Sequence, residues 1–239
     1  MSVFTYHLVR INYLSALKAM LFPSRIPDTP GLIHAEYMTA MTLGSAIFSP
    51  SRIRIRQKAL FAQWENEAAI DHFLKKNPQG KTFARGWHVR MTFLRQWGKI
   101  SAFEIPDTSR ESEASDPEAP VVAVTIARMK LPEIPRFIQW GRPVEKLVRD
   151  HPGTTLSLAS IRFPRTVSTF SIWETQQQMT DMVQGHSAVP RPKRHIDAMK
   201  ERDRKDFHFE FTTLRFKPLS EAGEWNGKRN YIPHHPNKN

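Results

Sequence analysis

Residues 59–74, ALFAQWENEAAIDHFL, and residues 168–183, STFSIWETQQQMTDMV, follow one pattern. Each begins with a β-rich run that ends in a Trp-Glu pair, Trp64-Glu65 in the first copy and Trp173-Glu174 in the second. Each continues with a polar start and apolar residues at helical spacing, which predicts a strand that leads directly into a helix. Because the pattern occurs twice, the sequence predicts a chain of two similar halves.

Similar extended and helical segments surround both copies. The predicted strands are Val3–Ile11, His34–Leu43 and His88–Trp97 in the first half and Val121–Met129, Thr154–Phe163 and His208–Phe216 in the second, and the predicted upstream helices are Tyr13–Phe22 and Pro132–Val148. Strand, helix, strand, strand, helix, strand, read twice, is the ferredoxin-like arrangement in tandem. The predicted fold is therefore α+β, with two tandem ferredoxin-like halves that pack sheet against sheet as a dimeric α+β barrel and enclose a pocket.

Composition divides the chain at two places. The stretch IPDTSRESEASDPEAP, residues 105–120, lacks aromatic residues and is rich in Ser, Pro and acids, so it buries too little apolar surface to repay its ordering entropy. The tail beyond Pro218 is polar and broken by Gly and Pro. We expect an N-terminal half at 1–103, an acidic linker at 104–120, a C-terminal half at 121–218 and a flexible tail at 219–239.

The composition and the missing motifs exclude several kinds of site. The 239 residues include no Cys, which removes disulfides, thiolate nucleophiles, zinc ribbons, iron–sulfur clusters and a thiolate-ligated haem. Any metal must then be held by His or by oxygen ligands. The sequence also lacks a Gly-x-Ser-x-Gly motif, a phosphate-binding Gly-rich loop and a His-Glu-x-x-His motif. No signal-peptide pattern opens the chain, and Lys18 interrupts its most apolar early run, so we expect a cytoplasmic protein.

The charge of the chain favours anionic partners. The formal net charge is +12 and the pI is about 10.2. The excess is larger outside residues 104–120, which carry six acids against Arg110 alone. An anionic membrane surface is the partner that we expect from this excess. Nucleic-acid binding is a minor rival, because charge is its only support.

Histidine is the side chain left to hold a soft metal, and one segment brings it into a suggestive pattern. Pro190 and Pro192 fit a loop that delivers the chain into a helix at about Lys193. On that helix His195, Met199 and Arg202 fall at i, i+4 and i+7, hence on one face. The spacing suits a haem, with imidazole on iron, Met against the macrocycle and Arg towards a propionate. By itself, however, the spacing is more typical of an exposed helix face with a polar His.

Several short motifs, in order, resemble the spheroidene monooxygenase family of the bacterial carotenoid pathway. The run Thr169-Phe170-Ser171-Ile172-Trp173, a helix, the Gly185-His186 step and the helix led by His195 resemble the C-terminal half of that family. The matching motifs of the rest of the chain are Thr29-Pro30-Gly31-Leu32, Phe48-Ser49-Pro50, Arg95-Gln96-Trp97-Gly98 and Arg136-Phe137 with Trp140-Gly141-Arg142. The resemblance covers roughly Tyr13 to Pro218. A longer basic loop before His195, a longer acidic linker and an unmatched tail depart from it.

The resemblance implies a haem-dependent monooxygenase that uses dioxygen and an electron-donor reductase to oxygenate a lipophilic, carotenoid-like or isoprenoid-like substrate. It implies His195 as the proximal iron ligand, with Met199 and Arg202 beside it and His186 as the competing ligand. It also implies a cytoplasmic or membrane-associated protein. Two alternatives stay open: a haem-binding protein without organic turnover, and a cofactor-free α+β-barrel protein of the antibiotic-biosynthesis monooxygenase type.

Overall fold

The computed structural model describes residues 2–21, 29–46, 49, 51–101 and 116–233. The N-terminal half contains β1 (Val3–Arg10), α1 (Tyr13–Leu21), β2 (Leu32–Met41), β3 (Ile53–Trp64), α2 (Glu67–Lys76), α3 (Pro78–Phe83) and β4 (Trp87–Lys99). The C-terminal half contains β5 (Val121–Met129), the 3-10 turn η2 (Leu131–Glu133), α4 (Ile134–Asp150), β6 (Thr154–Arg162), β7 (Thr166–Trp173), α5 (Gln176–Gln184), α6 (Arg194–Arg204) and β8 (His208–Ala222). Most of the predicted linker lies outside the described residues.

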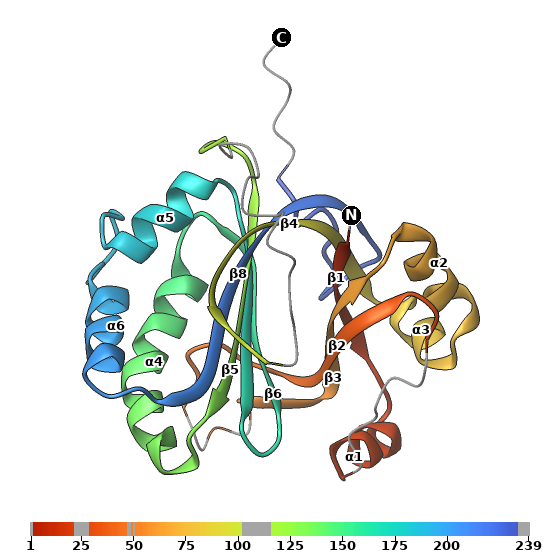
Figure 1. The fold of residues 1–239 in the computed structure, drawn as a ribbon, viewed down its shortest axis with the longest axis horizontal. Helices are drawn as coiled ribbons and strands as arrows, with labels where there is room; N and C mark the ends of the chain where they lie inside the picture. Colours follow the sequence, from red (N-terminus) through yellow and green to blue (C-terminus); the bar gives the residue numbers. More distant parts are fainter. Residues whose placement is uncertain (1, 22–28, 47–48, 50, 102–115, 234–239) are drawn as a thin grey trace.

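The strands of both halves join into one closed barrel, in the order β1-β3-β2-β6-β7-β5-β8-β4 (Figure 1). Within it the first half has the order β4-β1-β3-β2 and the second half has β8-β5-β7-β6, which is the same ferredoxin-like order. The two Trp-Glu strands also share their register, because Trp64 lies opposite Val3 and Trp173 lies opposite Val121. The predicted fold is confirmed.

Each Trp-Glu pair is followed by a residue that starts a helix. The Asn66 side chain accepts a hydrogen bond from the Ala69 backbone N–H, and the Thr175 hydroxyl accepts one from Gln178 N–H. Asn and Thr are preferred at this position because their side chains satisfy backbone donors that the first helical turn leaves free. The repeat therefore encodes a strand end and a helix start in three consecutive residues.

Two ladders of unequal length hold the halves together. Strands β4 and β8 pair along most of their length, from His88 opposite Ala222 to Lys99 opposite Phe211. Strands β2 and β6 pair over only three positions, centred on Ala40 opposite Ser160. One seam of the barrel is thus long and the other is short.

Side chains from both sheets fill the barrel interior. The rings of Tyr6 and Phe170 stack across it with centroids 3.9 Å apart, and those of Phe4 and Phe216 lie 4.9 Å apart. All four side chains are almost completely buried. The sequence predicts a pocket between the two sheets; at these positions large aromatic rings from strands of both halves lie inside the barrel instead.

The described part of the tail is packed, whereas the sequence predicts a flexible segment from residue 219. Strand β8 continues to Ala222, and the Tyr231 ring packs edge-on against Trp87 with centroids 5.6 Å apart. Glu221 accepts hydrogen bonds from Trp87 Nε1 at 2.7 Å and from the Tyr231 backbone N–H at 3.0 Å. This described part of the tail is held because its two large aromatics, Trp225 and Tyr231, have buried partners.

Candidate functional site

The outer faces of the two half-sheets are packed differently. On the N-terminal half, Leu60 of β3 is fully buried in one hydrophobic cluster with Phe73 of α2. On the C-terminal half, Thr169 of β7 takes the place of Leu60, because it stands at the same distance from the final Trp of its strand. Thr169 is only half-buried. The helix layer therefore closes tightly on the first half-sheet and less tightly on the second.

Three threonines cross the outer face of the C-terminal half-sheet. Thr125 of β5 lies opposite Thr169 of β7 on one side and opposite Thr213 of β8 on the other, and its hydroxyl oxygen is 3.3 Å from that of Thr213. We call these residues the threonine row. All three are half-buried although helices lie on this side of the sheet, with α4 and α5 next to it and α6 outside α4 (Figure 1). Incomplete burial beneath a helix layer indicates accessible space between the sheet and the helices.

Helix α6 carries the predicted stripe of His195, Met199 and Arg202. It begins at Arg194, close to the predicted start. The Arg202 guanidinium lies over the Phe211 ring of β8, with its carbon 4.1 Å from the ring centroid, so the Arg202 end of the stripe contacts the sheet. Ala198, one turn after His195, is buried on the same side. His195 and Met199 are half-buried.

The imidazole of His195 is held by one nitrogen. Its Nδ1 lies 3.1 Å from the Val183 carbonyl oxygen at the end of α5. Because a carbonyl oxygen only accepts, Nδ1 must carry the proton, and in the neutral ring Nε2 keeps its lone pair. Burial lowers the pKa of His195 below its ordinary value, and the hydrogen bond to Val183 offsets part of this effect. The ring is thus neutral near pH 7 with a fixed tautomer, which is the state required of a metal ligand.

His186, the competing ligand, lies elsewhere. Helix α5 ends at Gly185, which adopts the left-handed conformation with φ of 72°. The backbone N–H of His186 donates to the Asp181 carbonyl at 2.8 Å, which completes the helix terminus, and the side chain is exposed. The structure therefore separates His186 from the stripe on α6.

A pair of arginines borders the threonine row and was missed as a site in the sequence. Arg95 of β4 and Arg215 of β8 lie directly opposite each other, and their guanidinium carbons are 4.7 Å and 4.5 Å from the Trp97 ring centroid. Burial and the nearby Arg95 lower the pKa of Arg215 below its ordinary value. Within the described residues neither arginine has a carboxylate partner, whereas Arg202 has Asp206 at 3.9 Å. Like charges that face each other across a ladder are unfavourable, so this pair favours an anion.

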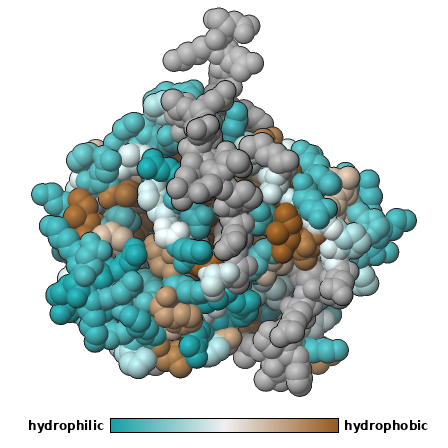
Figure 2. Space-filling view, in the orientation of Figure 1, coloured by the Kyte–Doolittle hydropathy of each residue, from teal (hydrophilic) through white to brown (hydrophobic). Residues whose placement is uncertain are grey.

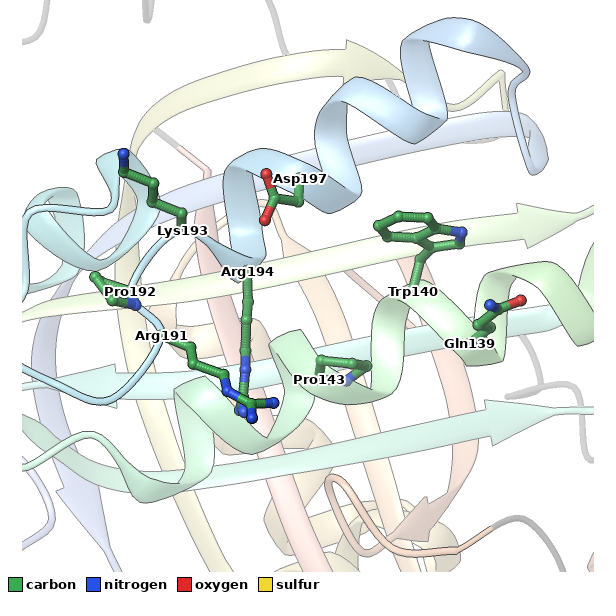
Figure 3. Close-up of a pocket in the computed structure, with 8 residues that line it drawn as sticks. All are labelled: Gln139, Trp140, Pro143, Arg191, Pro192, Lys193, Arg194 and Asp197. Carbon is green, nitrogen blue, oxygen red and sulfur yellow. The ribbon is translucent and has the colours of Figure 1, made fainter.

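An open cleft of about 560 Å³ lies on another side of α6, between that helix and α4 (Figure 3). Trp140 and Pro143 contribute its apolar surface. Figure 3 shows the guanidinium groups of Arg191 and Arg194 close together beside Pro143, and Lys193 and Asp197 also line the cleft. His195 is not among its lining residues. The cleft is a basic surface next to the predicted ligand rather than the ligand's own site.

Other features of the described residues limit what the site can be. No group of three or more His, Asp or Glu residues among them could hold a metal ion. None of the described helices is long and apolar enough to cross a bilayer. Figure 2 shows hydrophilic side chains over most of one face, with hydrophobic surface gathered in patches, one of them beside α4 and α5.

Comparison with known proteins agrees with the predicted resemblance. The chain is 28% identical over 204 residues to the spheroidene monooxygenase of Rubrivivax gelatinosus. The aligned region covers 84% of this chain and 74% of that protein. No protein-family profile matches.

Solved structures are similar at lower identity. An aldoxime dehydratase in complex with butyraldoxime is 9% identical with a TM-score of 0.43, over 91% of this chain and 79% of that one. A ferredoxin-fold protein of Listeria monocytogenes related to antibiotic biosynthesis monooxygenases is 13% identical with a TM-score of 0.33, over 92% and 96% of the two chains. The assignment of the fold rests on the strand order itself.

Proposed function

We propose that this chain is a haem-dependent monooxygenase that oxygenates a lipophilic substrate in the space between the C-terminal half-sheet and α4, α5 and α6. The observation that carries the proposal is the state of His195, whose Nδ1 is held by the Val183 carbonyl 3.1 Å away while Nε2 is left as the basic nitrogen. The similarity to a monooxygenase supports the reaction class. A carotenoid-like or isoprenoid-like molecule is the proposed substrate.

The residues present fit a haem. Haem needs only one imidazole from the protein, because its macrocycle supplies four nitrogen ligands, so the absence of a multi-residue metal group among the described residues is compatible with it. His195 would hold the iron and Met199 would contact the macrocycle. Arg95 and Arg215 are better placed than Arg202 to pair with carboxylates, because the Arg202 charge already has Asp206 nearby. When bound, haem supplies the iron at which dioxygen is activated.

The chain's own side chains would shape the rest of the chemistry. The helix layer over the sheet limits access of bulk water, which suits an apolar substrate and strengthens local electrostatic interactions. The hydroxyls of the threonine row are the polar groups on the sheet side of the space, and a hydroxyl can donate a hydrogen bond to an oxygen atom held there. The partner hydroxyl 3.3 Å away would orient that donor.

Electrons for this reaction would come from a separate reductase, because the sequence contains no nicotinamide or flavin fingerprint. The cleft between α4 and α6 is a suitable surface for an acidic electron donor. Arg191, Lys193 and Arg194 line it against a single acid, Asp197, and Arg194 adjoins His195 in the chain. Complementary charge accelerates such encounters.

An absorption spectrum tests the proposal. We expect the purified protein, reconstituted with haem, to show a Soret band that His195→Ala abolishes or shifts and that His186→Ala leaves unchanged. A normal band in His195→Ala would refute the ligand assignment. No haem uptake by the unaltered protein would refute haem dependence and favour a cofactor-free barrel. Haem uptake without oxygenation of any lipophilic substrate would favour a haem-binding protein without organic turnover.

A further inference from the structure

Helix α1 exposes three large apolar side chains and buries a small one, the reverse of what is expected of a helix that packs on a barrel. Tyr13, Leu14 and Leu17 are 63%, 84% and 54% exposed, whereas Ala16 is fully buried. Residues 13, 14 and 17 lie on one helix face, since they are separated by three and four positions. A helix that served only to cover the sheet would bury its leucines and expose its small residues.

The fold fixes α1 in this orientation. The Asn12 side chain accepts a hydrogen bond from Ser15 N–H at 2.8 Å, which starts the helix. The Arg56 guanidinium lies over the Tyr13 ring, 4.6 Å from its centroid, and Arg56 Nε donates to the Ile11 carbonyl at 3.1 Å. Figure 1 shows α1 at one end of the molecule, set apart from α2 and α3. These contacts fix the start of α1, and with it the orientation in which Leu14 and Leu17 are exposed.

Three cations lie on α1 itself or on β3, the strand from which Arg56 contacts Tyr13. Lys18 on α1 and Arg54 and Arg56 on β3 are exposed. Residues 1–58 contain seven Lys and Arg but only two acids, and one of these, Glu36, is buried against arginines. We call Tyr13, Leu14, Leu17, Lys18, Arg54 and Arg56 the α1 surface. It combines aliphatic and aromatic side chains with three cations that have no carboxylate partner among the described residues.

We propose that the α1 surface docks the protein on an anionic lipid bilayer. Leucines inserted at the headgroup boundary, a tyrosine at the interface and flanking cations are the composition that lies on such a membrane without crossing it. A second copy of the chain is the less favourable occupant, because a symmetric contact would bring two sets of these cations together. Docking on a bilayer does not depend on haem. It would, however, bring the protein next to the membrane, from which a lipophilic substrate can be drawn.

Site-specific fluorescence tests the proposal, because the chain has no cysteine and a single introduced one takes the only label. A polarity-sensitive dye on Leu14→Cys should shift to the blue with vesicles of phosphatidylcholine and phosphatidylglycerol, and not with phosphatidylcholine alone. The matched control is Leu219→Cys, since Leu219 is also apolar and 48% exposed but lies on β8. A shift at both positions, or at neither, overturns the proposal.

Vesicle co-sedimentation gives a second measurement on unlabelled protein. Leu14→Ser with Leu17→Ser should weaken binding to the anionic vesicles at least about tenfold, since both leucines would lose their burial in lipid. Arg54→Ser with Arg56→Ser should weaken it by about fivefold for each removed charge. Binding that both double variants retain would exclude this surface. A dye shift on Leu14→Cys that rises with protein concentration in the absence of lipid would show that a second copy occupies it.

Discussion

Replacing Thr169 by Leu tests whether the C-terminal half holds open a ligand space that the N-terminal half closes. Leucine is the residue found at the equivalent position, Leu60, where it is fully buried. If about half of the new side chain is buried in Thr169→Leu, the added apolar burial contributes roughly 1 kcal/mol. The free energy of unfolding should rise by that amount and Tm by about 2–4 °C. Haem affinity should fall at least about tenfold, because the side chain occupies the space.

The reverse exchange, Leu60→Thr, is the matched control. It removes apolar volume from a closed cluster and buries a hydroxyl there, so it should cost about 3–4 kcal/mol. It should leave haem affinity unchanged. Urea unfolding of the haem-free proteins and haem titration followed at the Soret band measure both quantities. The reasoning is refuted if Thr169→Leu lowers stability by more than about 1 kcal/mol, as overpacking of a closed interface would, or if it binds haem like the unaltered protein.

Three further outcomes follow from individual side chains. Burial lowers the pKa of His88 to about 4 in the folded protein, so the stability that its neutral ring contributes is complete above pH 6.5 and is lost as the pH falls towards 4. In His88→Gln the free energy of unfolding, measured with urea, should therefore fall by up to about 3 kcal/mol less between pH 6.5 and pH 4 than in the unaltered protein. Glu36, 1% exposed and 2.9 Å from Arg162, holds a buried cluster, so Glu36→Gln should cost about 2–3 kcal/mol, whereas Glu224→Gln, which breaks an exposed pair, should cost less than about 1. Arg215→Gln should weaken haem binding about tenfold but leave binding of haem dimethyl ester unchanged, because the ester lacks the carboxylates; equal losses for both ligands would contradict an anion site.

The sequence was sufficient for the frame of the molecule because its signals are local. A strand end, a Glu and a capping residue stand together in both copies of the repeat, and the periodicity of the flanking runs then gives the tandem order. The stripe on α6 was also predictable, since residues 195, 199 and 202 belong to one helix. The neighbours that the stripe meets depend on how α6 packs, which no local pattern expresses.

The threonine row shows why the rest of the site could not be predicted. Thr125, Thr169 and Thr213 belong to three strands, and only the pairing register of β5 with β7 and β8 makes them neighbours. The same holds for Arg95 and Arg215, which meet across the long β4–β8 ladder. The packed tail depended on a distant partner as well, because Tyr231 is ordered by Trp87. The composition of the tail does not reveal such a contact.

The difference between the halves is energetic as well as geometric. A domain of ordinary stability has only about 5–15 kcal/mol to lose, and a fully buried leucine contributes roughly 1.5–3 of these. In the N-terminal half, the buried Leu60 makes this contribution to stability. In the C-terminal half, the equivalent position holds the half-buried Thr169, which does not. A ligand that fills the space can restore it, since binding to the folded state alone stabilises by about 2.7 kcal/mol at a hundredfold excess over Kd. One frame used twice therefore supplies a closed half that holds the fold and a half whose more open sheet face would gain stability from a bound ligand.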